Sequence, residues 1–321
     1  MSWKDKLKSL KAEFEGIIHS RDGHSQIQSP HGKYQNLDQQ PPPPPMHTRP
    51  PVSGPGPTFH TYWTPRFHPD TSVRVEWDAK LGNGSDGWGN HELQHYTAAA
   101  HNSFHTPNGQ LVIRALANNA ASSPQHRFTS ARLVSRTTLG RDHGVLTAVI
   151  LSPCAEGIWP AFWLLPKEPF SWPTDGEIDI AETWNGDREN RSCLHWGQHH
   201  EKRKHRVLGT KIHDMHARPV RYDLAWQQPG GTAGQGKLLW YIDKRPVMKA
   251  SIPEGTRPMR DMTILLNVAM GGNVCAGKKP RDGHYDMVVY SMCLASELEY
   301  GGWDRFEADW ANEDTPQGNT Y

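Results

Sequence analysis

Net charge, cysteine and long hydrophobic runs are all scarce in this sequence of 321 residues. Its 35 lysines and arginines nearly balance 34 aspartates and glutamates, so no global charge points to a nucleic acid as a partner. No apolar run approaches the length of about 18 residues that a membrane-spanning helix needs. These absences exclude a polyanion-binding protein and a membrane span.

The first residues, MSWKDKLKSL, are charged and do not resemble an apolar leader. We therefore expect a cytoplasmic protein with reduced thiols, with leaderless secretion or a misassigned gene start as alternatives. The four cysteines form no CxxC pair and lie at Cys154, Cys193, Cys275 and Cys293.

A hydrophobic content of 36% and a mean hydropathy of −0.74 are low for a chain of this length. We therefore expect one folded domain, residues 58–300, with flanking segments outside its core. A domain of about 240 residues buries enough surface to fold without a disulfide or a metal ion. We accordingly expect a monomer without a cofactor.

Residues 1–57 are predicted to form a short amphipathic helix followed by a disordered, proline-rich arm. The helix would pack on its own domain, or bind a membrane surface or a partner. Pro41 to Pro45 are interpreted as a spacer or as a ligand for an SH3- or WW-type partner. The helical stripe consists of Trp3, Leu7, Leu10, Phe14 and Ile17.

Residues 301–321 are rich in acidic residues and are predicted to be a solvated acidic tail. Trp303, Phe306 and Trp310 have helical spacing and could hold part of this tail on the domain.

Between residues 58 and 300, short β-favouring runs alternate with glycine, asparagine, aspartate and proline. Several short strands separated by such turn residues are typical of an antiparallel sandwich or jelly roll. No long helical period interrupts them, which disfavours an α/β fold. The predicted strands include QLVIRAL, GVLTAVIL, EIDIAE, KLLWYID and MTILLNVAM.

The segment DGEIDIAE carries three carboxylates, Glu177, Asp179 and Glu182. On a strand, Glu177 and Asp179 point to one face because the side-chain period is two. Glu182 would point away unless one residue near Ile180 is bulged out. With that bulge, the Cα atoms of the two glutamates lie roughly 13 Å apart and their carboxyl groups can lean to about 5 to 5.5 Å. This is the separation that a retaining glycosidase uses.

Tryptophan use agrees with a sugar site. Tryptophan, with 13 residues, is commoner than tyrosine (9) or phenylalanine (8). Trp159 and Trp163, in GIWPAFWLLP, have the spacing that places both indoles on one face of a strand. A flat indole offers an apolar face on which a pyranose ring can stack.

Several motifs together resemble glycoside hydrolase family sixteen, and most closely its laminarinase-like endo-β-1,3-glucanase branch. The six-residue ExDxxE spacing matches the bulged branch of that family, which also contains agarases, carrageenases and galactanases. The resemblance covers about residues 58–295 and rests on GWGNHELQHYT, TSARL, GIWPAFWLLP, GEIDIAETWNG, CLHWG and ILLNVAMGGN.

The resemblance implies a concanavalin-like β-jelly-roll sandwich with a concave substrate cleft. It implies a nucleophile at Glu177, an acid/base at Glu182 and an assisting Asp179, which would hydrolyse β-1,3-glucans with retention. It also implies a set of sugar-binding residues: Asn90, Glu92, Trp159, Trp163, His195, Trp196 and Asn267. Members of this family often bind calcium. One acidic calcium ligand, early in the chain of those members, has no counterpart here, whereas Asp286 matches a ligand late in the chain.

Two other functions remain as alternatives. The first is a non-catalytic, lectin-like module that binds β-glucan. The second is a zinc peptidase, because His91-Glu-Leu-Gln-His95 is a literal HExxH motif with His101 at the spacing of a third ligand. That motif needs a helix, whereas this segment lies among strand signals.

Overall fold

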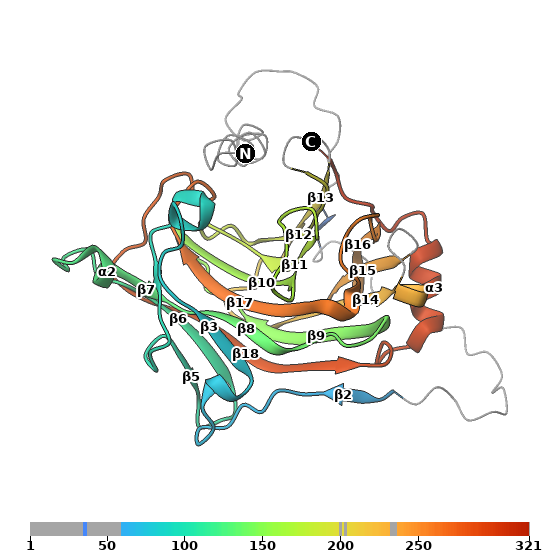
Figure 1. Ribbon diagram of the computed structural model, residues 1–321, viewed down its shortest axis with the longest axis horizontal. Helices are drawn as coiled ribbons and strands as arrows, with labels where there is room; N and C mark the ends of the chain where they lie inside the picture. The colour runs from blue at the N-terminus through green and yellow to red at the C-terminus, as the bar shows by residue number, and fades with distance from the viewer. Residues whose placement is uncertain (1–34, 37–58, 199–200, 202–203, 232–235, 321) are drawn as a thin grey trace.

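The computed structural model describes residues 35–36, 59–198, 201, 204–231 and 236–320. In these residues the chain forms two large β-sheets stacked face to face (Figure 1). The predicted all-β jelly-roll sandwich is confirmed. None of the helices in the described ranges is both long and apolar enough to span a membrane.

The first sheet has eight strands in the described part of the chain, and it carries the candidate site. Their order is β1 (Gln35–Asn36), β13 (His205–Lys211), β12 (Glu189–His195), β11 (Glu177–Glu182), β10 (Ile158–Pro166), β17 (Met262–Met270), β8 (Arg132–Thr138) and β3 (Trp77–Lys80). Apart from the parallel pair β1 and β13, its neighbouring strands are antiparallel.

The second sheet has ten strands in the described residues, eight on its main path and two beside that path. Their order is β16 (Arg245–Ser251), β15 (Lys237–Ile242), β14 (Val220–Gln227), β9 (His143–Leu151), β18 (Gly283–Ala295), β6 (Leu111–Ala117), β7 (Phe128–Ser130) and β4 (His95–Tyr96), with β2 (Thr61–Trp63) beside β18 and β5 (Ser103–His105) beside β6. The helical segments are η2 (Val73–Val75), η3 (Gly87–His91), α2 (Pro124–Arg127), η4 (Pro229–Gly231), η5 (Met259–Asp261) and α3 (Gly302–Ala311).

The main core lies between the two sheets. Trp77, Trp226 and Trp240 are fully or almost fully buried there, together with alternate residues of both sheets. The indole N–H of Trp240, on β15, donates to the backbone carbonyl of Asp179 on β11 at 2.9 Å. The second sheet therefore supports the acidic strand from behind.

Part of the acidic C-terminal segment packs on the domain and is not a solvated tail. It forms α3, which lies against the second sheet beside β14 and β15 (Figure 1). Phe306 is fully buried in a second core cluster with Val145, Ala225 and Leu239, and Trp303 and Trp310 pack against that cluster. The helical spacing of the three aromatic residues is thus confirmed, whereas the predicted boundary at residue 300 divides one packed unit.

Two residues of the predicted disordered arm also belong to the domain, since Gln35 and Asn36 pair with the edge strand β13. A backbone edge can accept such a strand whatever the composition of the arm. The predicted N-terminal helix and the ligand segment Pro41 to Pro45 lie outside the described residues.

Asp286, which matches a late calcium ligand of the resembled family, forms an ion pair with Arg114. Arg114 donates to both carboxylate oxygens of Asp286 at 2.7 Å each. This bidentate contact occupies both oxygens of the carboxylate that matches a calcium ligand. All four cysteines have free thiols, as expected.

Candidate active site

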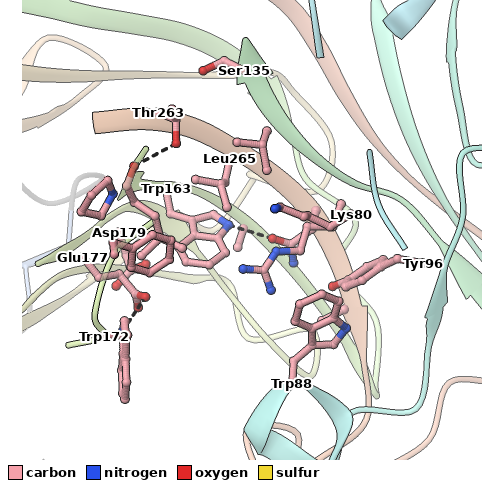
Figure 2. A pocket seen from close by; sticks show the side chains of 18 of the residues that line it. Lys80, Trp88, Tyr96, Ser135, Trp163, Trp172, Glu177, Asp179, Thr263 and Leu265 are labelled. Atoms are coloured by element: carbon pink, nitrogen blue, oxygen red, sulfur yellow. Dashed lines mark hydrogen bonds between the residues drawn. The ribbon is translucent and has the colours of Figure 1, made fainter. Parts of the chain in front are cut away.

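A cleft of about 700 Å³ lies on the outer face of the eight-stranded sheet. It is lined by side chains of β3, β8, β10, β11, β12 and β17 and by the loops beside them. In Figure 2, Glu177, Asp179 and Trp172 lie along one side of this cleft, and Trp88 and Tyr96 lie across from them. Nine of the ten predicted site residues line it: Asn90, Glu92, Trp159, Trp163, Glu177, Asp179, Glu182, His195 and Asn267.

A β-bulge in β11 brings the three carboxylates to one face. On the β10 side, Trp163 pairs with Asp179 and Phe162 pairs with Ala181, so Ile180 has no partner. The β12 side shows a register shift between Asp179 and Glu182. Ile180 and Ala181 both belong to the core cluster, and Glu182 therefore returns to the cleft. The bulge predicted at this position is confirmed.

Asn190 stabilises the bulge from the neighbouring strand β12. Its buried side-chain amide accepts a hydrogen bond from the backbone N–H of Glu182 at 3.2 Å. It also donates to the backbone carbonyl of Ile180 at 3.3 Å. These contacts satisfy backbone groups that the interrupted ladder leaves without strand partners. Sequence reasoning missed Asn190, because a bulge has no local sign of which neighbour supports it.

Glu177 is held by a tryptophan of the loop before β11. The indole N–H of Trp172 donates to Glu177 Oε2 at 2.8 Å. A hydrogen bond of this kind favours the ionised carboxylate and fixes its orientation. Trp172 was missed by the sequence analysis, although its place five residues before Glu177 in SWPTDGE was a usable signal.

Glu182 has the protonation behaviour of an acid near neutral pH. Its pKa is raised to about 7, chiefly by burial and to a smaller extent by the nearby charge of Glu92. The indole N–H of Trp159 donates to Glu182 Oε1 at 2.6 Å, and this contact and the charge of Arg191 lower the pKa. Near pH 7 the carboxyl group therefore exists in both protonation states, which suits a group that must donate and accept one proton.

Asp179 lies between the two glutamates and is almost fully buried. Burial, followed by the negative charges of Glu177 and Glu182, raises its pKa well above the usual range. His195 Nε2 lies 3.6 Å from Asp179 Oδ2. Because burial lowers the pKa of His195 to about 4, the ring is neutral at pH 7 and this contact is no ion pair.

The remaining walls combine aromatic faces with polar atoms. Trp163 donates its indole N–H to Asn267 Oδ1 at 2.7 Å, and the Arg132 guanidinium lies 4.7 Å from the centre of the Trp163 ring and 4.5 Å from that of Trp88. Trp88 Nε1, Asn90 Oδ1 and Arg132 Nε are buried without a partner in the described part of the protein. Because buried polar atoms normally have a hydrogen-bond partner, these three atoms are candidates to bind hydroxyl groups of a ligand.

Trp88 and Arg132 were not predicted as site residues. Trp88 stands within GWGN and has a positive φ of 57°, which turns this loop into the cleft. Arg132 comes from β8, in the TSARL motif. Both segments were quoted as motifs in the sequence, but their side-chain directions depend on the backbone geometry.

Trp196, the tenth predicted site residue, does not line the cleft. It follows His195 directly, and successive side chains of an extended chain point in opposite directions. Trp196 instead lines a second hollow with Arg206 and Trp310. The Arg206 guanidinium lies 5.9 Å from its ring centre.

The HExxH segment does not form a zinc-peptidase site. Its helical turn η3 ends at His91, and Glu92 has the extended backbone angles φ −60° and ψ 147°. His91 contacts Asp86 at 2.8 Å, whereas His95 lies on β4. Among the described residues, neither histidine belongs to a group of three close metal-ligating side chains. Glu92 instead reaches into the cleft and accepts a hydrogen bond from Asn90.

Comparison with known proteins gives one consistent result. Residues 87–232 match a family model described as "XgeA-like, catalytic GH16 domain". The chain is 29% identical over 232 residues to a glucan endo-1,3-beta-glucosidase of Cryptopygus antarcticus, with 67% of this chain and 82% of that protein covered. It is 27% identical over 229 residues to the clotting factor G alpha subunit of Tachypleus tridentatus, covering 68% of this chain and only 31% of that protein.

A solved structure agrees with these sequence matches. The endo-beta-1,3-glucanase of Pyrococcus furiosus is 25% identical and superposes with a TM-score of 0.62. The superposition covers 74% of this chain and 94% of that structure.

Proposed function

The chain belongs to glycoside hydrolase family 16, and from this premise we propose that it is a retaining endo-hydrolase of β-1,3-glucans. The observation that carries the proposal is the row of Glu177, Asp179 and Glu182 on the cleft face of a bulged strand. Glu182 has a pKa of about 7 in that row. A pair of carboxyl groups in unlike environments is what a double displacement at a sugar carbon requires.

In the first step, Glu177 attacks the anomeric carbon and Glu182 donates its proton to the leaving glycosidic oxygen. A glycosyl–enzyme ester forms, and the glycosidic bond breaks. Trp172 holds the Glu177 carboxylate during this step. Asp179, whose raised pKa keeps it protonated, can donate a hydrogen bond to Glu177 and separate the charges of the row.

In the second step, the deprotonated Glu182 takes a proton from water, and the resulting hydroxide attacks the anomeric carbon from the side of the departed sugar. Glu177 leaves as a carboxylate, and Glu182 is protonated again. Two inversions give net retention. The pKa of Glu182 near 7 allows both halves of this cycle to run without a large energetic cost for either protonation state.

The cleft properties support a neutral polysaccharide as substrate. Trp88 and Trp163 line it as aromatic surfaces for sugar rings, and unpartnered buried atoms of Trp88, Asn90 and Arg132 offer hydrogen bonds to hydroxyl groups. A volume of about 700 Å³ is ample for several sugar units. The names of the Cryptopygus antarcticus and Pyrococcus furiosus relatives favour a β-1,3-glucan over an agarose or a galactan.

The test compares the wild type with Glu177→Gln on laminarin, lichenan, agarose and a galactan. We expect the wild type to release short oligosaccharides from laminarin, detected by mass spectrometry. The variant keeps the size and polarity of the side chain but has no nucleophile, so it should lose on the order of 10⁴-fold or more in rate. Hydrolysis at the wild-type rate by this variant would refute the assignment of the nucleophile.

Binding of laminarin is measured on both proteins in parallel. A correctly folded wild type that binds laminarin but hydrolyses none of the four polymers would support the lectin-like alternative. Further proposals concern a monomeric state, a cytoplasmic location, the absence of a cofactor and a role of Pro41 to Pro45 in binding an SH3- or WW-type partner.

A further inference from the structure

A buried cysteine lies beside the row of carboxylates, on the neighbouring strand. Cys193, on β12, pairs across the ladder with Asp179 on β11. Its Sγ atom is 3.1 Å from Nε2 of His195, two residues further on the same strand face. Cys193 is 5% exposed and does not itself line the cleft, whereas Asp179 and His195 do. The mechanism above makes no use of the thiol.

The three side chains offer a mixed set of ligand atoms at short distances. One sulfur, one imidazole nitrogen and one carboxylate oxygen lie within 4.8 Å of one another. Among the described residues, no other His, Cys, Asp and Glu side chains gather in a group of three as close as this one. Sulfur and imidazole nitrogen are the ligands that Zn²⁺ and related thiophilic cations prefer.

Two of the three distances between the ligand atoms agree with a tetrahedral ion. Bonds of about 2.3 Å to sulfur and about 2.0 to 2.2 Å to nitrogen and oxygen place ligand atoms about 3.4 to 3.6 Å apart. The observed sulfur–nitrogen distance is 3.1 Å, and the nitrogen–oxygen distance between His195 and Asp179 is 3.6 Å. Each differs from the tetrahedral value by no more than about 0.5 Å, which side-chain rotations can supply.

The surroundings attract a cation. Glu177 and Glu182 lie close enough to Asp179 for their negative charges to act on it. A divalent ion would be attracted by the negative charge of the ionised glutamates. The fourth coordination position would open toward the cleft, where water or a sugar hydroxyl could occupy it.

We propose that Asp179, Cys193 and His195 form a binding site for a thiophilic divalent cation such as Zn²⁺, and that the bound ion inhibits the enzyme. Binding replaces the S–H bond of Cys193 and the O–H bond of the protonated Asp179 with bonds to the metal. It releases two protons to solvent, and no electron is transferred. Inhibition follows because the ion takes Asp179 away from Glu177 and occupies the cleft beside His195. This consequence depends on the proposed glycosidase function, but the metal site does not.

The test uses Co²⁺ as a spectroscopic probe of the full chain. A cobalt–thiolate bond gives a near-ultraviolet charge-transfer absorption that histidine or carboxylate ligation alone does not give. We expect this band to rise to one equivalent of Co²⁺ in the wild type and in a Cys154→Ser control, and to vanish when Zn²⁺ is added. It should be absent from Cys193→Ser, and His195→Ala should weaken Co²⁺ binding by about tenfold or more.

A wild type without the band, or a band that persists in Cys193→Ser, would overturn the site. Cys193→Ser is a small change, and its circular dichroism and melting temperature are compared with those of the Cys154→Ser control. If Cys193→Ser does not fold, the proposal is tested by His195→Ala alone. Unchanged Co²⁺ affinity of His195→Ala would then overturn the proposal.

Inhibition is measured separately, as the laminarin hydrolysis of each protein relative to its own metal-free rate. Zn²⁺ should inhibit the wild type and Cys154→Ser, chelation should restore both, and Cys193→Ser should need at least about tenfold more Zn²⁺. Equal inhibition of all three proteins would show that the ion does not inhibit through this site. The cobalt absorption band can be measured even if the protein has no glucanase activity. Failure of the proposed function and failure of the metal site are therefore distinguishable.

Discussion

The hydrogen bond from Trp159 to Glu182 makes a quantitative prediction about pH dependence. The indole N–H donates to Glu182 Oε1 at 2.6 Å and lowers the pKa of that carboxyl group, which burial raises to about 7. Trp159→Phe keeps an aromatic ring and removes the donor. Because the hydrogen bond stabilises only the ionised form, its loss must raise the pKa further.

The size of the shift follows from the energy of a hydrogen bond to a charged group. Such a bond contributes about 1.5 to 3 kcal/mol, and one pKa unit corresponds to about 1.4 kcal/mol, so the pKa should rise by about 1 to 2 units. The first step of the proposed mechanism needs protonated Glu182. The basic limb of the kcat/KM profile should therefore move from about pH 7 to about pH 8 or above.

The assay is the pH dependence of kcat/KM on laminarin, with Trp163→Phe as the matched control. Trp163 lies on the same strand and lines the same cleft, but its indole N–H donates to the neutral Asn267. Both variants should lose rate, and only Trp159→Phe should move the basic limb. A basic limb that stays in place or moves to lower pH in Trp159→Phe would refute the reasoning.

Three further outcomes are expected. Glu182→Gln should raise the free energy of unfolding in urea by up to about 3 kcal/mol at pH 8 and by nearly nothing at pH 4. The reason is that the Glu182 carboxyl group keeps its proton up to about pH 7 in the folded protein but loses it near pH 4.5 in the unfolded chain. The stability of the wild type therefore falls between these two pH values, and the neutral glutamine avoids that loss. Equal stabilisation at both pH values would contradict the raised pKa. Phe306→Ala should cost about 3 to 5 kcal/mol of stability in the same assay, and a change under 1 kcal/mol, on the order of a surface substitution, would contradict the packing of α3. Trp163→Ala should raise KM for laminarin several-fold to about tenfold, whereas Trp196→Ala should leave KM unchanged. A larger increase of KM in Trp196→Ala than in Trp163→Ala would contradict the placement of Trp196 outside the cleft.

The acidic strand could be read from the sequence because its information is local. The period of two places Glu177 and Asp179 on one face, and the carboxylate of Glu182 requires a bulge to join them. The structure has that bulge at Ile180, whose side chain and that of Ala181 are both buried in the core. The five-residue step from Glu177 to Glu182, combined with the strand period of two, pointed to a bulge near Ile180 or Ala181.

The partners of the acidic strand could not be read in the same way. Asn190, Trp172 and Arg132 reach the site from a neighbouring strand, a loop and a strand across the sheet. Their positions depend on long-range pairing that the spacing within one segment does not encode. Trp196 lies outside the cleft for a related reason: it follows His195 in the CLHWG motif, and adjacent residues of an extended chain point in opposite directions.

The C-terminal segment shows the limit of composition as evidence. Its acids suggested solvation, but Glu307 pairs with Lys237 of β15 at 2.6 Å. Phe306 can be buried only because Val145, Ala225 and Leu239 present an apolar patch on the outer face of the second sheet. That receiving surface is formed by three separate strands, and it exists only after the sheet has assembled.

The anomeric configuration of the first product tests the central claim most directly. Proton NMR is recorded during the first minutes of laminarin hydrolysis by the wild type, before mutarotation mixes the anomers. New reducing ends should appear first in the β configuration, because Glu177 and Glu182 act in two successive inversions. New ends that appear first in the α configuration would mean a single displacement and would contradict the assignment of Glu177 as nucleophile.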